Sequence, residues 1–104
     1  MAKKAKAKPQ QVEVENVNHP GQITRVDATK YQAVRTALLA VLPSDPPGLT
    51  QREMIDATAQ RVDQALFPGG AKAGWWVKTV QLDLEAKGVM RREASKPLRW
   101  YRLE

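Results

Sequence analysis

A helix ends and a strand begins within the stretch LEAKGVM, which occupies residues 84–90. Before Gly88, apolar residues recur at helical spacing and predict a helix over residues 73–87, because glycine is the usual residue just past a helix end. After Gly88, alternating side chains predict strands over residues 89–93 and 98–103, separated by turn residues. The last third of the chain is therefore predicted to be a helix followed by a two-stranded β-hairpin.

A second helix is predicted to open at the stretch LTQRE, residues 49–53. Thr50 and Glu53 have the spacing of a capping box, in which each side chain binds the backbone amide of the other residue. Beyond it, four apolar residues recur in one helical stripe: Ile55, Ala59, Val62 and Leu66. The stripe predicts that this helix continues to the Pro-Gly-Gly segment that follows it.

The first helix is predicted over residues 28–42, with Asp27 as its N-cap and Pro43 just beyond its end. Residues 12–17 alternate apolar and polar side chains, a pattern that fits either a short strand or an extended arm. The first eleven residues are rich in lysine and alanine and have little to bury, so we expect disorder there. The expected organisation is a tail over 1–11, an arm over 12–26 and one domain over 27–104.

The predicted core collects the inward positions of the three helices and one or two positions from the hairpin. Its members are Tyr31, Val34, Leu38, Leu42, Ile55, Val62, Leu66, Trp76, Val80, Leu84 and Val89. From the last strand we expect Leu98 and Trp100 to point inward.

The order of helix, loop, helix, turn, helix and hairpin resembles that of winged helix-turn-helix domains, over residues 27–103. The resemblance rests on the two stretches at residues 49–53 and 84–90. It implies an α+β fold with a three-helix core and a C-terminal β-hairpin, the wing. The segment GGAKAGWW at residues 69–76 is also similar to a small uncharacterised bacterial protein family, for which no activity is implied.

In DNA-binding winged helices the third helix enters the major groove and the wing contacts the backbone or minor groove. The resemblance therefore implies nucleic-acid binding, and duplex DNA as a partner, for a small regulator or accessory protein. It implies groove-facing residues on the third helix: Lys72, Trp75, Lys78 and Thr79. It implies phosphate-facing residues on the wing and at its base: Arg91, Arg92, Lys96 and Arg99.

The net charge of +6 is only a weak argument for nucleic-acid binding, because much of it lies in the tail. Four lysines of the tail supply four of these charges: Lys3, Lys4, Lys6 and Lys8. The rest of the chain therefore carries +2, with the excess of basic residues in the last third.

The third helix departs from the pattern of a base-reading helix. Trp75 and Leu82 fall on the side opposite its inward face, one above the other, where a base-reading helix normally offers polar side chains. Three interpretations compete: the arm covers this face, the face binds a protein partner or a second copy of the chain, or Trp75 packs on nucleic acid. Exposure of the Trp75 indole distinguishes the first two.

Several functions find no support in the sequence. The chain has no cysteine and a single histidine, His19, so neither a metal site nor a nucleophile–base pair is expected. The glycines before Trp75 lack the Gly-Lys-Ser/Thr ending of a phosphate loop. We expect no enzyme activity, no cofactor and no small-molecule ligand. No apolar run is long enough to span a membrane, and a cytoplasmic protein is expected.

Overall fold

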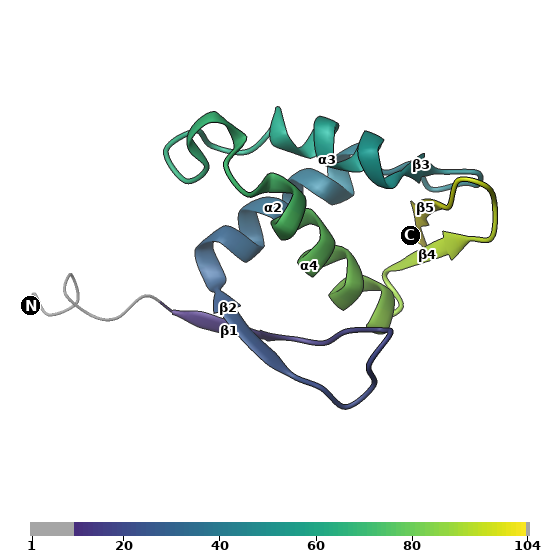
Figure 1. Cartoon of the computed structure of the whole chain (residues 1–104), viewed down its shortest axis with the longest axis horizontal. Helices are drawn as coiled ribbons and strands as arrows, with labels where there is room; N and C mark the ends of the chain where they lie inside the picture. Colours follow the sequence, from purple (N-terminus) through teal and green to yellow (C-terminus); the bar gives the residue numbers. More distant parts are fainter. Residues whose placement is uncertain (1–9, 104) are drawn as a thin grey trace, which may run out of the picture.

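A computed structural model describes residues 10–103 of the chain and shows an α+β fold, as predicted (Figure 1). The elements follow in the order β1 (Gln11–Val14), β2 (Thr24–Asp27), α2 (Ala28–Val41), β3 (Leu49–Thr50), α3 (Gln51–Ala59), a short 3-10 helix (Pro68–Gly70), α4 (Ala73–Ala86), β4 (Met90–Glu93) and β5 (Arg99–Arg102). None of the helices in this part of the chain is long and apolar enough to cross a membrane. The predicted disordered tail lies outside the described residues, except for its last two, and the second of these begins β1.

The first helix, α2, begins and ends where the sequence places it. The side chain of Asp27 accepts a hydrogen bond from the backbone N–H of Lys30 at 2.9 Å, so the predicted N-cap is confirmed. The helix ends at Leu42, directly before Pro43, and buries Tyr31 and Leu38 against the other helices.

The second helix, α3, has the predicted start but is shorter than predicted. The amide of Thr50 donates to Glu53 at 2.9 Å and the amide of Glu53 donates to the Thr50 hydroxyl at 3.2 Å, which confirms the capping box. The helix stops at Ala59, so the prediction that it reaches Leu66 is wrong. Beyond it, the Asp63 side chain accepts from the amide of Ala65, and such a local bond competes with helical pairing.

The third helix, α4, ends in the capping motif that the stretch at residues 84–90 predicts. Gly88 has a φ of 75°, which glycine adopts without steric cost. The amide of Gly88 donates to the carbonyl of Glu85, and the amide of Val89 donates to that of Leu84 at 2.9 Å. These are the two bonds of a Schellman motif, and they turn the chain directly from α4 into β4.

The predicted C-terminal hairpin is present, and a third strand joins it. β4 and β5 pair antiparallel, and β3 pairs with the other edge of β5, so the order is β3-β5-β4. The sequence did not reveal β3, because Leu49 and Thr50 read as the start of α3. Gly48 permits this pairing: a Cβ at this position would lie 2.0 Å from the carbonyl oxygen of Trp100.

The arm forms a second antiparallel sheet with strands β1 and β2, in which Val12 lies opposite Val26. The strands are therefore not confined to the C-terminal hairpin of β4 and β5, which we call the wing. Figure 1 shows this hairpin running along one side of the helices, with its loop near the C-terminal end of α4.

The core lies between the three helices and takes side chains from both sheets. Its buried apolar members are Val14, Val26, Tyr31, Val34, Ala37, Leu38, Leu42, Met54, Val62, Phe67, Trp76, Val77, Val80, Leu84, Met90 and Trp100. Three predicted members, Ile55, Leu66 and Val89, are only partly buried and pack against it.

One predicted core position is wrong, because Leu98 is 41% exposed. Leu98 is two positions before Trp100, so in a continuous strand both side chains would point to the same face. It lies before the start of β5, however, where this alternation of faces does not apply. Trp100 points inward as predicted and is 4% exposed.

Candidate functional site

The outward face of α4 is half covered and half open. Trp75, in the first turn, is 55% exposed, whereas Leu82, two turns later on the same side, is 9% exposed. The arm causes the difference: the amide of Val17 donates to the carbonyl of Leu82 at 3.3 Å, and Val14 is buried beside the helix. Covering by the arm therefore holds for Leu82 and not for Trp75.

The arm is fastened to α4 through the carboxylate of Asp83, which is fully buried. One oxygen accepts from the backbone N–H of Glu15 at 2.8 Å and from the ammonium group of Lys87 at 2.5 Å. The other accepts from the hydroxyl of Tyr31 on α2 at 2.5 Å. Burial and this hydrogen bond raise the pKa of the Tyr31 hydroxyl above its ordinary value.

Sequence reasoning missed Asp83 as an anchor, although the sequence carried a signal. Asp83 lies three positions after Val80, on the inward side of the predicted helix, and a buried carboxylate needs partners. The partners come from three places in the chain, so spacing along α4 does not reveal them.

The exposed indole of Trp75 is held by other aromatic rings. Its ring centroid lies 5.1 Å from that of Trp76 at an interplanar angle of 85°, an edge-to-face contact. Trp76 in turn contacts Phe67 edge-on at 6.3 Å. The Trp75 side chain is therefore supported from below while much of its surface remains open to a partner.

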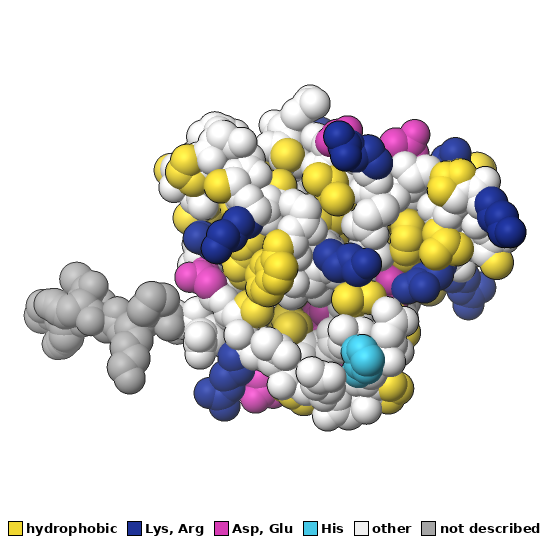
Figure 2. All heavy atoms as spheres, in the orientation of Figure 1, with side chains coloured by type: hydrophobic (Ala, Val, Ile, Leu, Met, Phe, Trp, Pro, Cys, Tyr) yellow, Lys and Arg dark blue, Asp and Glu magenta, His cyan; other side chains and the backbone are white. Residues whose placement is uncertain are grey.

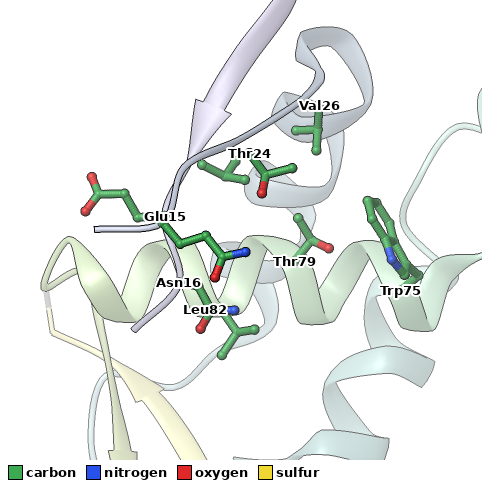
Figure 3. Close-up of a pocket in the computed structure, with 9 residues that line it drawn as sticks. Glu15, Asn16, Thr24, Val26, Trp75, Thr79 and Leu82 are labelled. Carbon is green, nitrogen blue, oxygen red and sulfur yellow. The ribbon is translucent and has the colours of Figure 1, made fainter. Parts of the chain in front are cut away.

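Two hollows adjoin Trp75. One is lined by Lys30, Lys72, Trp75 and Trp76, which makes it cationic. The other, which we call the arm pocket, lies between the arm and α4 and has a volume of about 140 Å³ (Figure 3). Residues of both elements line the arm pocket: Val14, Glu15, Asn16, Gln22, Thr24, Val26, Trp75, Thr79 and Leu82.

A third hollow joins α4 to the wing. Lys78 of α4 lines it together with Arg52 of α3 and with Pro97 and Leu98 from the wing turn. Figure 2 shows the result on one face of the molecule, where lysine and arginine side chains surround hydrophobic ones. Of the predicted residues of the third helix, the structure thus brings Lys78 close to the wing turn.

The predicted phosphate-facing residues of the wing differ in their surroundings. Arg91 and Lys96 are exposed. Arg92 pairs with Glu85 at 3.2 Å and lies over the Trp100 ring, 5.4 Å from its centroid.

Glu85 also connects α4 to β5, because its carboxylate accepts a hydrogen bond from the indole N–H of Trp100 at 3.0 Å. Arg99 donates to the carbonyl of Gly48 at 3.2 Å and lies 3.6 Å from Glu53. Arg92 and Arg99 thus have structural partners, whereas Arg91 and Lys96 project into solvent.

On the third helix, the predicted residues fall into two groups. Lys72 and Lys78 are exposed and flank Trp75, and Thr79 is partly buried in the arm pocket. Within residues 10–103, neither lysine forms an ion pair. Lys72 has a φ of 60°, a left-handed conformation at the entry to the helix.

Residues 10–103 contain no group of three or more histidine, cysteine, aspartate or glutamate side chains that could hold a metal ion. His19 lies exposed in the loop of the arm, where its backbone amide donates to the carbonyl of Asn16.

The chain matches the model of a family of unknown function (DUF6958) over residues 11–100. It therefore belongs to this family, whose extent includes the arm, the helices and most of the wing. No curated protein and no solved structure matches the chain.

Proposed function

We propose that the protein is a winged-helix-like, nucleic-acid-binding protein that uses the first two turns of α4 together with the wing. The order α2, β3, α3, α4, β4, β5 supports the winged-helix interpretation, because a three-helix core is followed by a hairpin. The sheet order β3-β5-β4 adds to it, since the strand before α3 ties the wing to the helices.

The observation that carries the proposal is the exposed indole of Trp75 between Lys72 and Lys78, two lysines without an ion pair among residues 10–103. Helices that read DNA contact base edges mainly with their N-terminal residues. Here the arm covers Leu82 and the second half of the helix, but it leaves Lys72, Trp75 and Lys78 open. We therefore assign binding to the open half of the helix.

Charge around the open half favours a polyanion. Lys30 and Lys72 line one hollow beside Trp75, and Arg52 and Lys78 line another next to the wing turn. Lysine and arginine side chains at such positions neutralise phosphates and displace counterions, so binding weakens as salt rises. The aromatic ring adds a contact to sugar or base that does not depend on salt.

The proposal is tested by fluorescence anisotropy with a labelled random-sequence duplex over a series of salt concentrations. The full chain is used, and its four tail lysines, Lys3, Lys4, Lys6 and Lys8, are replaced by glutamine so that the tail does not supply the signal. We expect micromolar binding at low salt that weakens steeply as salt is added. Loss of all binding with the tail charges would contradict the proposal.

A charge-matched pair of variants in this background locates the surface. Lys72→Gln combined with Lys78→Gln should lower the slope of log affinity against log salt by about two. The control combines Arg61→Gln and Arg25→Gln, two exposed arginines away from the α4–wing hollow. Equal slopes for both double variants would place binding elsewhere.

A second candidate function is docking of a protein partner, or of a second copy of the chain, on Trp75. The exposed fraction of this indole favours it, because large aromatic side chains are frequent anchors at interfaces. Leu82, the other residue of the proposed anchor, is covered by the arm, so Trp75 would act without it. Sedimentation velocity separates self-association from the first proposal: a dimer that Trp75→Ala dissociates would favour docking.

A further inference from the structure

We propose that the arm pocket receives a single unpaired nucleobase, stacked on Trp75, from a nucleic acid bound at the α4–wing surface. This inference rests on the proposed function and names its substrate class more narrowly: nucleic acid with an unpaired nucleotide. It gives the arm a role that the resemblance to winged helices does not assign.

The size of the pocket limits what it can hold. Its volume of about 140 Å³ is below the roughly 300–1,000 Å³ of pockets that enclose drug-sized ligands. The space therefore suits one small ring system better than a drug-sized ligand. The exposed indole of Trp75 lines the pocket on the side of the first turn of α4 (Figure 3).

The walls of the pocket match a flat aromatic ring. Trp75 offers an aromatic surface on one side, and Val26 and Leu82 offer apolar contacts on others. Stacking on an aromatic side chain is the main way in which proteins hold unpaired bases. The edge-to-face contact with Trp76 already orients the Trp75 indole, so little side-chain freedom is lost when a base stacks on it.

The polar groups of the pocket match the edges of a base. Asn16 and Gln22 each carry one acceptor and two donors, and Thr24 and Thr79 each carry a hydroxyl that does both. Bases present donors and acceptors side by side along their edges, so uncharged groups of this kind can pair with them. Among the described residues, Glu15 is the one charged residue that lines the pocket, and its carboxylate points away from the centre in Figure 3.

The phosphate of the same nucleotide has a separate place. Trp75 lines both the arm pocket and the hollow that contains Lys30 and Lys72. We therefore assign the backbone of a base in the arm pocket to the side of these two lysines. Cations beside an aromatic platform are the usual combination at sites for single-stranded nucleic acid.

The test compares three labelled DNA duplexes with the full chain, at one salt concentration, by anisotropy. The first is fully paired, the second carries one unpaired nucleotide as a bulge, and the third carries an abasic residue at the bulge. We expect the bulged duplex to bind about tenfold more tightly than the other two, because stacking contributes about 1–3 kcal/mol per base.

Two variants test whether this preference arises in the pocket. Trp75→Ala removes the aromatic surface on which the base would stack. Thr79→Leu fills the pocket with a larger side chain, and leucine favours the helix. In both, the ratio of bulge affinity to paired affinity should fall to about one. Thr36→Leu, an exposed threonine on α2 far from the pocket lining, is the matched control and should keep the wild-type ratio. Urea unfolding of each variant confirms that it is folded.

The outcomes separate this inference from the proposed function. Equal affinity for the three duplexes would overturn the inference and leave duplex binding intact. Equal tightening by the bulge and by its abasic form would also overturn it, because the protein would then recognise a bend and not a base. Failure to bind any of the three duplexes would contradict both the proposed function and the inference that rests on it.

Discussion

The first and second halves of α4 carry similar outward residues in opposite environments. Trp75 and Leu82 are both large and apolar and lie on the same side of one helix, yet the first is exposed and the second is buried. Lys78 in the first half has no ion partner within residues 10–103, whereas Lys87 at the end of the second half pairs with buried Asp83. The difference is made by the arm, which covers only the second half.

This comparison teaches that the environment of a helix face can be set by a segment far away in the sequence. The second half is a structural joint, where α2, α4 and the arm meet at one carboxylate. The first half is an exposed surface, where Trp75 packs against Trp76 on the side of the core and is open to solvent on its other side. Variants in the two halves should therefore affect different properties: stability in the second half, and binding in the first.

The largest expected effect contrasts two adjacent tryptophans. Trp76 is 7% exposed and packs against Phe67, so Trp76→Ala should lower the free energy of unfolding by about 3–5 kcal/mol. Trp75→Ala should lower it by less than about 1 kcal/mol, since most of that side chain already contacts water. Urea unfolding followed by far-UV circular dichroism measures both. Similar losses for the two variants would show that Trp75 belongs to the core.

The next effect tests the joint between α4 and the arm. Asp83→Ala leaves the Tyr31 hydroxyl and the Glu15 amide without their acceptor, so the free energy of unfolding should fall by about 2–4 kcal/mol. Asp56→Ala is the control, because Asp56 is exposed and its ion pair with Arg52, at 3.4 Å, lies on the surface.

Hydrogen exchange refines the Asp83 experiment. In Asp83→Asn, which keeps the size of the side chain, the amides of Glu15 and Val17 should exchange faster than in the wild type. Amides in the middle of α2 should change less, because that helix keeps its other contacts. Uniform acceleration over the whole chain would instead mean that Asp83 supports the global fold and not the arm in particular.

The pH dependence of stability tests the same joint from the side of Tyr31. Because burial and the bond to Asp83 raise the pKa of this hydroxyl above its ordinary 10.0, the unfolded chain loses the proton first as pH rises. Above about pH 10 the unfolded state therefore binds fewer protons, and the contribution of Tyr31 to stability falls with pH.

Tyr31→Phe isolates this contribution, since other groups titrate in both proteins. The wild type should be the more stable of the two near neutral pH. From about pH 10 upward, the difference should shrink by up to about 1.4 kcal/mol per pH unit. Urea midpoints measured for both proteins at several pH values give the result. A difference that stays constant over this range would mean that Tyr31 titrates normally in the folded protein.

Much of the fold was predictable from local signals. The N-cap at Asp27, the capping box at Thr50 and Glu53, and Gly88 after α4 each use bonds between residues a few positions apart. Such bonds leave a direct pattern in the sequence. The same holds for the hairpin of β4 and β5, whose strands are close in the chain.

The features that the sequence did not predict depend on contacts between residues far apart in the chain. β3 is only two residues long and exists because it pairs with β5, about fifty positions later. The arm pairs its strands across the loop that contains His19, and its hold on α4 comes from Asp83, 68 positions from Glu15. The resemblance to winged helices implied eight candidate nucleic-acid residues, but it did not reveal that Arg92 and Arg99 have partners within the fold.

The smallest expected effect on stability comes from two lysines, Lys78 within α4 and Lys87 at its C-cap. This pair also tests most directly whether the two halves of α4 differ in function. Lys78→Gln should leave the free energy of unfolding within about 0.5 kcal/mol of the wild type, and should lower the salt slope of duplex binding by about one. Lys87→Gln should do the reverse. It removes a partner of buried Asp83 at a cost of about 1 kcal/mol, and it should leave the slope unchanged, since Lys87 lies at the opposite end of α4 from the proposed binding surface. If Lys87→Gln lowered the slope and Lys78→Gln did not, the nucleic acid would lie against the arm side of α4, and the open half would be free for a protein partner.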